Sequence, residues 1–196
     1  MYDVIENVLE EHHFTFLYSV IFGGEQEWKV TPDIAGTGRA NTMGFHDTFY
    51  FMNGGIQNEK TLFLCFPILG ICCSKEGFGD FDMLAGRVFQ TVPVNPVPDF
   101  RSTVHTDFPT GAGNEFIPYR VCLYFLTSHE EEQAATVFFD DDLNVVDKFQ
   151  PKANTALLFD GSIKHCGGFP ASGRRIIVNF NYSSKGLADR FFRGES

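Results

Sequence analysis

The chain lacks the features of a secreted or membrane-embedded protein. Its five cysteines are odd in number, unevenly spaced and without a C-x-x-C pair, so a disulfide framework is not expected. The first eleven residues are acidic and contain no basic segment of the kind that opens a signal peptide. No apolar run reaches the length of a membrane span, and the longest, 61–73, is interrupted by Pro67. We expect a cytoplasmic protein with buried, reduced thiols and no membrane contact.

Positive charge is also scarce. The chain has 15 Lys and Arg against 25 Asp and Glu, which gives a formal net charge of -10. A negative surface repels phosphate backbones, so nucleic acid is not an expected partner. The adjacent Arg174 and Arg175 leave a local basic patch open. The sequence also has no internal repeat and no low-complexity tract, which excludes repeat architectures.

Aromatic side chains, by contrast, are abundant: 23 of the 196 residues are Phe. Hydrophobic residues make up 43% of the chain and charged residues 20%, an ordinary balance for a globular protein. Large flat side chains in this number favour a strand-rich core over a helical bundle. The length suits one domain, 1–196, in which residues 1–100 supply helices and supporting strands around a core at 101–182.

The first hundred residues give the less regular pattern. Val4, Ile5, Val8 and Leu9 follow helical spacing, which predicts an amphipathic helix over 3–20 that breaks near His13. Residues 22–60 are expected to form loops with short strands, such as Phe49–Met52. An apolar strand or buried segment is expected over 61–68, and a helix around 81–87. Residues 91–99 are expected to form an extended connector that contains prolines.

From residue 101 onward the pattern changes to short strand-like segments separated by turn residues. This rhythm is typical of a sandwich or a barrel, and it does not fit alternating β-α units. The expected strands are 101–107, 119–127, 135–140, 144–149, 155–160 and 174–182. The fold class predicted by the sequence is therefore mainly β with flanking helices.

Three residues of this second half could bind a metal ion. His105 and Asp107 are two apart, so on a strand their side chains project from the same face. His165, which follows the strand 155–160, is the leading candidate for a third ligand. Two histidines and one carboxylate leave open positions on one side of an octahedron, an arrangement that suits non-haem iron(II). An H-x-D pair alone is weak evidence, since it often has a structural role.

Arg175 strengthens the pattern. It lies ten residues after His165 in the apolar strand R-I-I-V-N-F-N-Y. A guanidinium that faces an apolar interior needs a partner, because an unpaired buried charge is costly. A dicarboxylate ligand would supply that partner through a bidentate contact. The alternative is an ion pair between Arg175 and a carboxylate of the protein itself.

Four segments in this order resemble the 2-oxoglutarate- and iron(II)-dependent oxygenases, in particular the prolyl 4-hydroxylase-like branch. They are H-T-D-F-P at 105–109, L-Y-F-L at 123–126, P-K-A-N-T-A-L-L-F-D-G-S-I-K-H at 151–165 and G-R-R-I-I-V-N-F-N-Y at 173–182. The resemblance covers about 80 residues. It implies a double-stranded β-helix, which is a jelly-roll or cupin-like core, with metal ligands at His105, Asp107 and His165.

The resemblance also implies a cosubstrate site. Of the two adjacent arginines, Arg175 is the one that the motif favours for the distal carboxylate of 2-oxoglutarate, with Asn179 and Asn181 on the same strand face. The hydroxyl of Tyr124 is expected to reach the same carboxylate. The implied cofactors are iron(II), 2-oxoglutarate and oxygen, with ascorbate in support. The implied reaction is hydroxylation of an unactivated C–H bond, most simply in a peptidyl proline.

Two positions depart from the family pattern. Ala134-Ala135 stands where many members have a Gly-Gly pair, and Asn181 stands where peptide prolyl hydroxylases tend to have tryptophan. The second departure puts the proline substrate in question, so a free amino acid or a small metabolite is the alternative. Two further alternatives are a cupin-like metal enzyme and a metal-dependent sensor, neither of which uses 2-oxoglutarate. The sequence does not fix the oligomeric state.

Overall fold

The computed structural model of the chain describes residues 1–23, 26–31, 44–93, 102–108 and 118–186. Strands predominate in these ranges. They are β1 (Tyr2–Glu6), β2 (Lys29–Thr31), β3 (Gly44–Phe51), β4 (Gly55–Ile56), β5 (Phe81–Thr91), β6 (Arg120–Phe125), β7 (Thr136–Phe139), β8 (Val145–Phe149), β9 (Thr155–Asp160), β10 (Lys164–Cys166) and β11 (Arg175–Ser184). The helices are α1 (Glu11–Phe22), α2 (Glu59–Glu76) and a short 3-10 turn at Glu132–Ala134.

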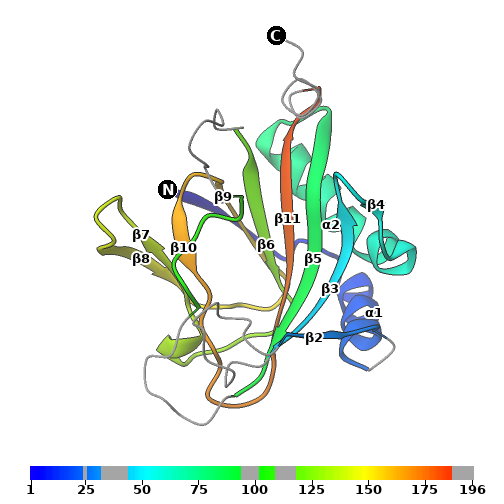
Figure 1. Cartoon of the computed structure of the whole chain (residues 1–196). Coiled ribbons are helices and arrows are strands. Elements are labelled where there is room, and N and C mark those ends of the chain that lie inside the picture. The colour runs from blue at the N-terminus through cyan, green and yellow to red at the C-terminus, as the bar shows by residue number, and fades with distance from the viewer. Residues whose placement is uncertain (24–25, 32–43, 94–101, 109–117, 187–196) are drawn as a thin grey trace.

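The strands form two antiparallel sheets. The larger has the order β1-β9-β6-β11-β5-β3-β2, with β4 paired to β3, and the smaller has the order β10-β7-β8. In Figure 1 the smaller sheet stands beside the larger one, while α1 and α2 lie on the other side of the larger sheet. Two facing antiparallel sheets are the arrangement expected of a jelly roll.

The alternation of side chains along β11 divides the interior into two parts. Ile176, Val178 and Phe180 face the helices, where they join the cluster that α1 and α2 cover. Ile177 belongs to the second cluster, which lies between the two sheets and includes Phe138 from β7. Every residue of β11 except the last is buried, because both of its faces are covered.

Residues 61–68, expected to form an apolar strand or a buried segment, belong to helix α2, so the strand assignment is wrong. The ends of α2 carry strong signals: the side chain of Asn58 accepts a hydrogen bond from the Thr61 amide, and Gly77 adopts a left-handed conformation after the last turn. The buried positions between these caps recur at helical spacing. They are Thr61, Cys65, Ile68, Leu69, Cys72 and Cys73.

Two further assignments in the N-terminal half are wrong. Residues 2–6 form edge strand β1, and the left-handed conformation of Asn7 separates this strand from the helix that begins at Glu11. The expected helix around 81–87 is part of strand β5, which pairs with both β3 and β11. In both places the spacing of the apolar residues fits a helix as well as a strand. Pairing with strands that are distant in sequence makes these residues part of the sheet.

The second half agrees more closely with the sequence. The strands expected at 119–127, 135–140, 144–149, 155–160 and 174–182 are confirmed as β6, β7, β8, β9 and β11. The expected strand 101–107 is reduced to a single bridge between His105 and His165, and short strand β10 was not foreseen. Most of the connector 91–99 lies outside the described residues.

All five cysteines are buried thiols, as expected. Among the helices that the structure describes, none is long and apolar enough to cross a membrane.

Gly86 offers a test of the packing on the helix side of the sheet. A methyl group at this position would overlap the ring of Phe49, a buried residue that contacts Phe180 edge-on at 5.7 Å between ring centroids. We expect Gly86→Ala to lower the free energy of unfolding by about 1–3 kcal/mol, a typical cost of overpacking. Denaturant unfolding of the metal-free protein would measure it. Gly79→Ala, where the added methyl group meets open space, is the control, and equal stability of both variants would contradict the packing.

Candidate metal and cosubstrate site

The backbone brings His105 and His165 side by side. The amide of each residue donates to the carbonyl of the other, at 3.0 and 2.9 Å, so the segment 102–108 lies along β10. The contact continues where the Ser102 amide donates to the Gly167 carbonyl. Because directly opposed residues of an antiparallel pair project to the same side, the two imidazoles lie together, with ring centroids 4.8 Å apart.

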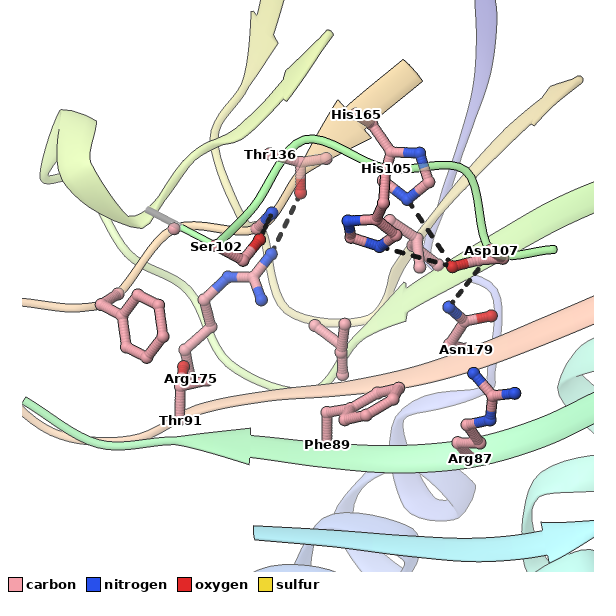
Figure 2. A pocket seen from close by; sticks show the side chains of 15 residues that line it. Arg87, Phe89, Thr91, Ser102, His105, Asp107, Thr136, His165, Arg175 and Asn179 are labelled. Carbon is pink, nitrogen blue, oxygen red and sulfur yellow. Dashed lines mark hydrogen bonds and ion pairs between the residues drawn. The ribbon is translucent and has the colours of Figure 1, made fainter. Parts of the chain in front are cut away.

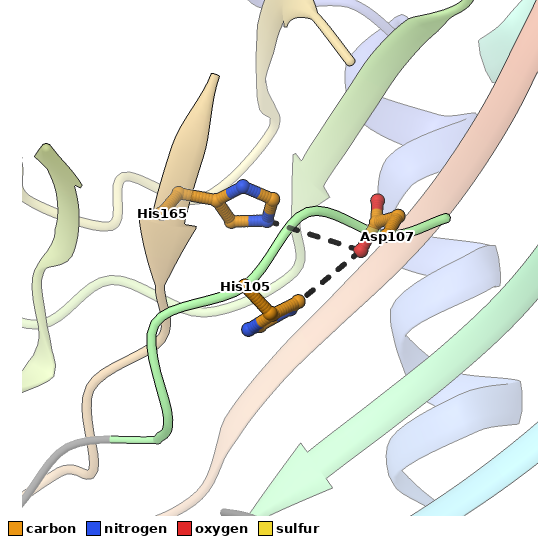
Figure 3. A group of neighbouring side chains, drawn as sticks. All are labelled: His105, Asp107 and His165. Carbon is orange, nitrogen blue, oxygen red and sulfur yellow. Dashed lines mark ion pairs between the residues drawn. The ribbon is translucent and has the colours of Figure 1, made fainter. Parts of the chain in front are cut away.

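Asp107 completes a compact group with the two histidines, shown in Figure 3. Its Oδ1 lies 3.7 Å from Nε2 of His105 and 3.9 Å from Nε2 of His165. One ligand atom from each of the three residues lies within 4.8 Å of the others. The structure thus brings together the three residues that the sequence analysis selected as metal ligands.

The hydrogen bond made by Nδ1 fixes the tautomer of each imidazole. Nδ1 of His105 is 2.7 Å from the Thr103 carbonyl oxygen, and Nδ1 of His165 is 3.1 Å from the Ile163 carbonyl oxygen. A carbonyl oxygen only accepts hydrogen bonds, so each Nδ1 must carry the proton. The lone pair of each neutral ring is therefore on Nε2, the atom that faces Asp107. This is the orientation that a metal ligand requires.

The carboxylate of Asp107 is held from the opposite side by β11. Nδ2 of Asn181 donates to its Oδ2 at 2.6 Å, and Nδ2 of Asn179 donates to the same oxygen at 3.2 Å. Two amide donors on Oδ2 leave Oδ1 directed at the histidines. Burial alone would raise the pKa of Asp107, but the neighbouring histidines and Asn181 together hold this pKa well below its usual value. Asp107 is consequently an anion at neutral pH.

The two histidines differ in their electrostatic surroundings. Burial lowers the pKa of His165, and the attraction of Asp107 only partly offsets this effect. Burial also acts to lower the pKa of His105, but Asp107 and the Thr103 carbonyl outweigh it, so the net shift is upward. His165 is therefore neutral at neutral pH, whereas His105 keeps its proton to a higher pH, and a cation that binds Nε2 of His105 would have to displace that proton.

Arg175 lies at the other end of the same cavity. Its side chain is only 3% exposed, its Nε donates to the Ala134 carbonyl at 3.0 Å, and its Nη2 donates to Oγ1 of Thr136 at 3.0 Å. Burial lowers the pKa of Arg175 to about 10, so the guanidinium remains charged at neutral pH. No carboxylate in the described part of the chain forms an ion pair with it. The alternative in which Arg175 pairs with a protein carboxylate is therefore unsupported.

The cavity between the two ends has a volume of about 210 Å³. Figure 2 shows the histidines and Asp107 on one side and Arg175 on the other, with Phe89 between them. Thr91 lines the cavity beside Arg175, and its buried Oγ1 has no hydrogen-bond partner among the described residues. Gly167 leaves the space in front of the guanidinium open, since a methyl group there would approach Nη1 to 3.6 Å. An anion at this point would meet a charged guanidinium and a free hydroxyl.

Tyr124 does not take the place that the sequence analysis gave it. It pairs with Val178 of β11 and shares the face of the sheet that the helices cover, where its hydroxyl donates to Oδ1 of Asn154 at 2.9 Å. Its neighbour Leu123 lines the cavity instead. Tyr124 is therefore not part of the cavity wall. The hydroxyl that lies beside Arg175 in the cavity is that of Thr91.

Asn179 and Asn181 share the predicted face of β11, but their side-chain amides contact Asp107 at the metal end of the cavity. Asn179 lines the cavity, and Asn181 contacts Asp107. Arg174 points away from the cavity and stacks on the ring of Phe22, with its guanidinium carbon 4.8 Å from the ring centroid. Three of the wall residues that sequence reasoning missed lie on β5, whose first part was expected to be a helix and whose last residue was assigned to the connector. They are Arg87, Phe89 and Thr91.

In comparisons by sequence, neither a protein-family model nor a curated protein matches the chain. Solved structures do resemble it. An oxidoreductase of the 2OG-Fe(II) oxygenase family from Burkholderia pseudomallei has a TM-score of 0.66 at 13% identity, covering 93% of this chain and 85% of that one. A prolyl hydroxylase from Trichoplax adhaerens, in complex with a hypoxia inducible factor peptide fragment, has a TM-score of 0.59 at 14% identity and covers 96% and 86%.

The chain has the fold of the 2-oxoglutarate- and iron(II)-dependent oxygenases. A third structure with this fold is HygX from Streptomyces hygroscopicus with nickel, 2-oxoglutarate and hygromycin B bound, which has a TM-score of 0.59 at 11% identity and covers 94% of this chain and 83% of that one. The predicted jelly-roll core is thereby confirmed. Structures with this fold hold molecules as different as a peptide fragment and hygromycin B, so the fold alone does not select a substrate.

The hydrogen bond from Asn181 to Asp107 predicts a measurable effect on metal binding. Asn181→Ala removes the shorter of the two amide contacts that orient the carboxylate, and we expect nickel(II) affinity to fall about 10–100-fold. Isothermal titration of the purified variants would measure this affinity. Asn144→Ala, on an exposed turn, is the control. Unchanged affinity in Asn181→Ala would show that Asp107 is not a ligand or does not need this support.

Proposed function

We propose that the protein is a 2-oxoglutarate- and iron(II)-dependent dioxygenase that hydroxylates an unactivated C–H bond. One observation carries the proposal: a His-Asp-His group lies at one end of a single cavity, and a buried arginine that has no acidic partner among the described residues lies at the other. The donor set fits non-haem iron(II), since two imidazoles and one carboxylate leave positions for a chelating cosubstrate and for oxygen. A five-carbon dicarboxylate supplies the anion that Arg175 lacks.

Different residues would bind the metal and position its carboxylate ligand. His105 and His165 would bind the metal through Nε2, and Asp107 through Oδ1, while Asn179 and Asn181 hold the carboxylate in place. When bound, iron(II) with 2-oxoglutarate and oxygen supplies the oxidising power for hydroxylation, with succinate and carbon dioxide as coproducts.

The cosubstrate end is built for a carboxylate. Arg175 is oriented by the Ala134 carbonyl and by Thr136, so the guanidinium is fixed before a ligand arrives. The hydroxyl of Thr91 can donate to a second carboxylate oxygen. Leu123 and Ile177 line the cavity and, with Phe89, exclude water from its centre. A cupin-like enzyme or a sensor that does not use 2-oxoglutarate would have no need for a buried arginine at this place.

The peptidyl proline substrate rests on the sequence resemblance and on the peptide bound to the Trichoplax adhaerens neighbour. One feature of the chain weighs against it. Asn181, which occupies the position where tryptophan is expected in peptide prolyl hydroxylases, is bound to Asp107 and forms no aromatic wall. We therefore propose hydroxylation as the reaction and a proline-rich peptide as the first substrate to test. A free amino acid or small metabolite is the alternative.

The test of the proposed reaction is succinate production by the purified protein with iron(II), ascorbate, oxygen and 2-oxoglutarate, with and without a proline-rich peptide. We expect iron-dependent succinate, lost in His105→Ala while the fold is retained. Succinate that rises with the peptide would support the prolyl substrate. Succinate unaffected by the peptide would support the alternative substrates, and full turnover by His105→Ala would contradict the ligand assignment.

The cosubstrate end gives a separate prediction. Arg175→Ala removes the only cation beside Thr91 among the described residues of the cavity wall, so the 2-oxoglutarate concentration for half-maximal turnover should rise at least about tenfold. Arg174→Ala, whose side chain stacks on Phe22 outside the cavity, should leave it unchanged. The reverse order would show that the other face of β11 binds the cosubstrate.

Thr91→Val separates an effect on 2-oxoglutarate binding from an effect on the stability of the fold. The substitution is nearly isosteric and removes a buried hydroxyl that has no partner among the described residues. We expect the metal-free variant to be at least as stable as the wild type, since an unsatisfied polar group is lost. Its affinity for 2-oxoglutarate should nevertheless fall by about tenfold. Thermal unfolding and titration of the nickel-loaded protein measure the two effects, and unchanged affinity would remove Thr91 from the site.

A further inference from the structure

A second arginine, Arg87, lines the same cavity. It comes from β5, where Arg87, Phe89 and Thr91 are spaced two apart and project to the same side. Their pairing with β11 is regular, so Thr91 stands opposite Arg175 and Arg87 stands opposite Asn179. Four residues of strand separate Thr91 from Arg87 by roughly 13 Å. Arg175 and Arg87 therefore lie at opposite ends of the cavity, as Figure 2 shows.

Arg87 is not explained by the proposed cosubstrate site. Its side chain is half-buried, and its one described contact is with the ring of Phe51, whose centroid is 5.8 Å from the guanidinium carbon. Within the described ranges it forms no ion pair, although the chain carries 25 acidic residues against 15 basic ones. A half-buried guanidinium in so acidic a chain would be expected to have a carboxylate neighbour.

The described groups around Arg87 do not supply such a carboxylate. His46 on β3 and His105 are close enough for the positive charge of Arg87 to act to lower their pKa values. Asp107 is the one acidic group of the described cavity wall, and its oxygens are already directed at Asn179, Asn181 and the histidines. The guanidinium is left to interact with a molecule that enters the cavity.

The position of Arg87 places such a molecule beside the metal ligands. Asn179, the residue directly opposite Arg87 on β11, donates to Asp107. Directly opposed side chains on one face of a sheet are about 5 Å apart at Cβ. A group bound by Arg87 is thus one strand spacing from the residue that orients a metal ligand, and the rings of Phe89 and Phe51 lie next to it.

We propose that Arg87 binds a carboxylate of the primary substrate, and that the substrate is a small carboxylic acid with an apolar body. This inference rests on the proposed function and refines it. The carboxylate pairs with Arg87, the apolar part contacts Phe89, and one C–H bond is presented to the metal. One atom of dioxygen enters this C–H bond, which becomes C–OH, and the other enters the succinate that forms as 2-oxoglutarate is oxidised and loses carbon dioxide. An internal peptidyl proline has no such carboxylate.

The test uses paired probes that differ in one charge. N-acetyl amino acids with apolar side chains, including N-acetylproline, are compared with their primary amides for binding to the nickel(II)-loaded protein, which does not turn over. Ligand-observed NMR titrations are run with and without 2-oxoglutarate, on the wild type, Arg87→Gln, Arg87→Lys and Arg174→Gln. We expect at least one acid to bind about tenfold or more tightly than its amide.

The preference for the acid should disappear in Arg87→Gln, return in part in Arg87→Lys and persist in Arg174→Gln. Two results would overturn the inference: no acid preferred over its amide in the wild type, or a preference that survives Arg87→Gln. A loss of 2-oxoglutarate affinity in Arg87→Gln as large as in Arg175→Ala would also overturn it, because Arg87 would then serve the cosubstrate. Failure of the wild type to bind 2-oxoglutarate would contradict the proposed function, while the titrations without 2-oxoglutarate still decide the role of Arg87.

Discussion

The site depends on keeping a buried cation and a buried carboxylate apart. Arg175 and Asp107 line one cavity, and an ion pair between them would neutralise both. Instead, the Ala134 carbonyl and Thr136 hold the guanidinium at one end, while two asparagines of β11 hold the carboxylate at the other. Both charges are therefore oriented in advance and available to ligands. On the proposed function, a metal ion would bind the carboxylate and a dianion the guanidinium, so ligand binding would raise the stability of the fold.

The histidines and Arg175 could be predicted from the sequence because each lies in a short motif whose meaning does not depend on exact strand pairing. His105 and Asp107 meet His165 even though 102–108 is not a regular strand, since one bridge to β10 is enough to align them. Tyr124 could not be placed in the same way. The face that it occupies is set by its pairing with Val178, and a shift of one residue exchanges the two faces of a strand.

The wall supplied by β5 was missed for a different reason. Arg87, Phe89 and Thr91 are spaced two apart, as residues on one face of a strand must be. The apolar residues among and before them also fit a short helix, however. Pairing with β3 and β11 is what makes this segment a strand. This one strand runs the length of the cavity from the cosubstrate end to the metal end. The part of the site most dependent on long-range pairing is thus also the part where we propose that the substrate binds.

The most direct test of the account is an anaerobic titration of the iron(II)-loaded protein with 2-oxoglutarate, followed by the visible charge-transfer absorption of an iron-bound 2-oxo acid. The account predicts a saturable absorption that is absent in His165→Ala and that requires much more 2-oxoglutarate in Arg175→Ala. A wild-type protein that binds iron(II) but develops no absorption at saturating 2-oxoglutarate would contradict it, because the cavity would then hold a metal without the cosubstrate for which Arg175 is buried.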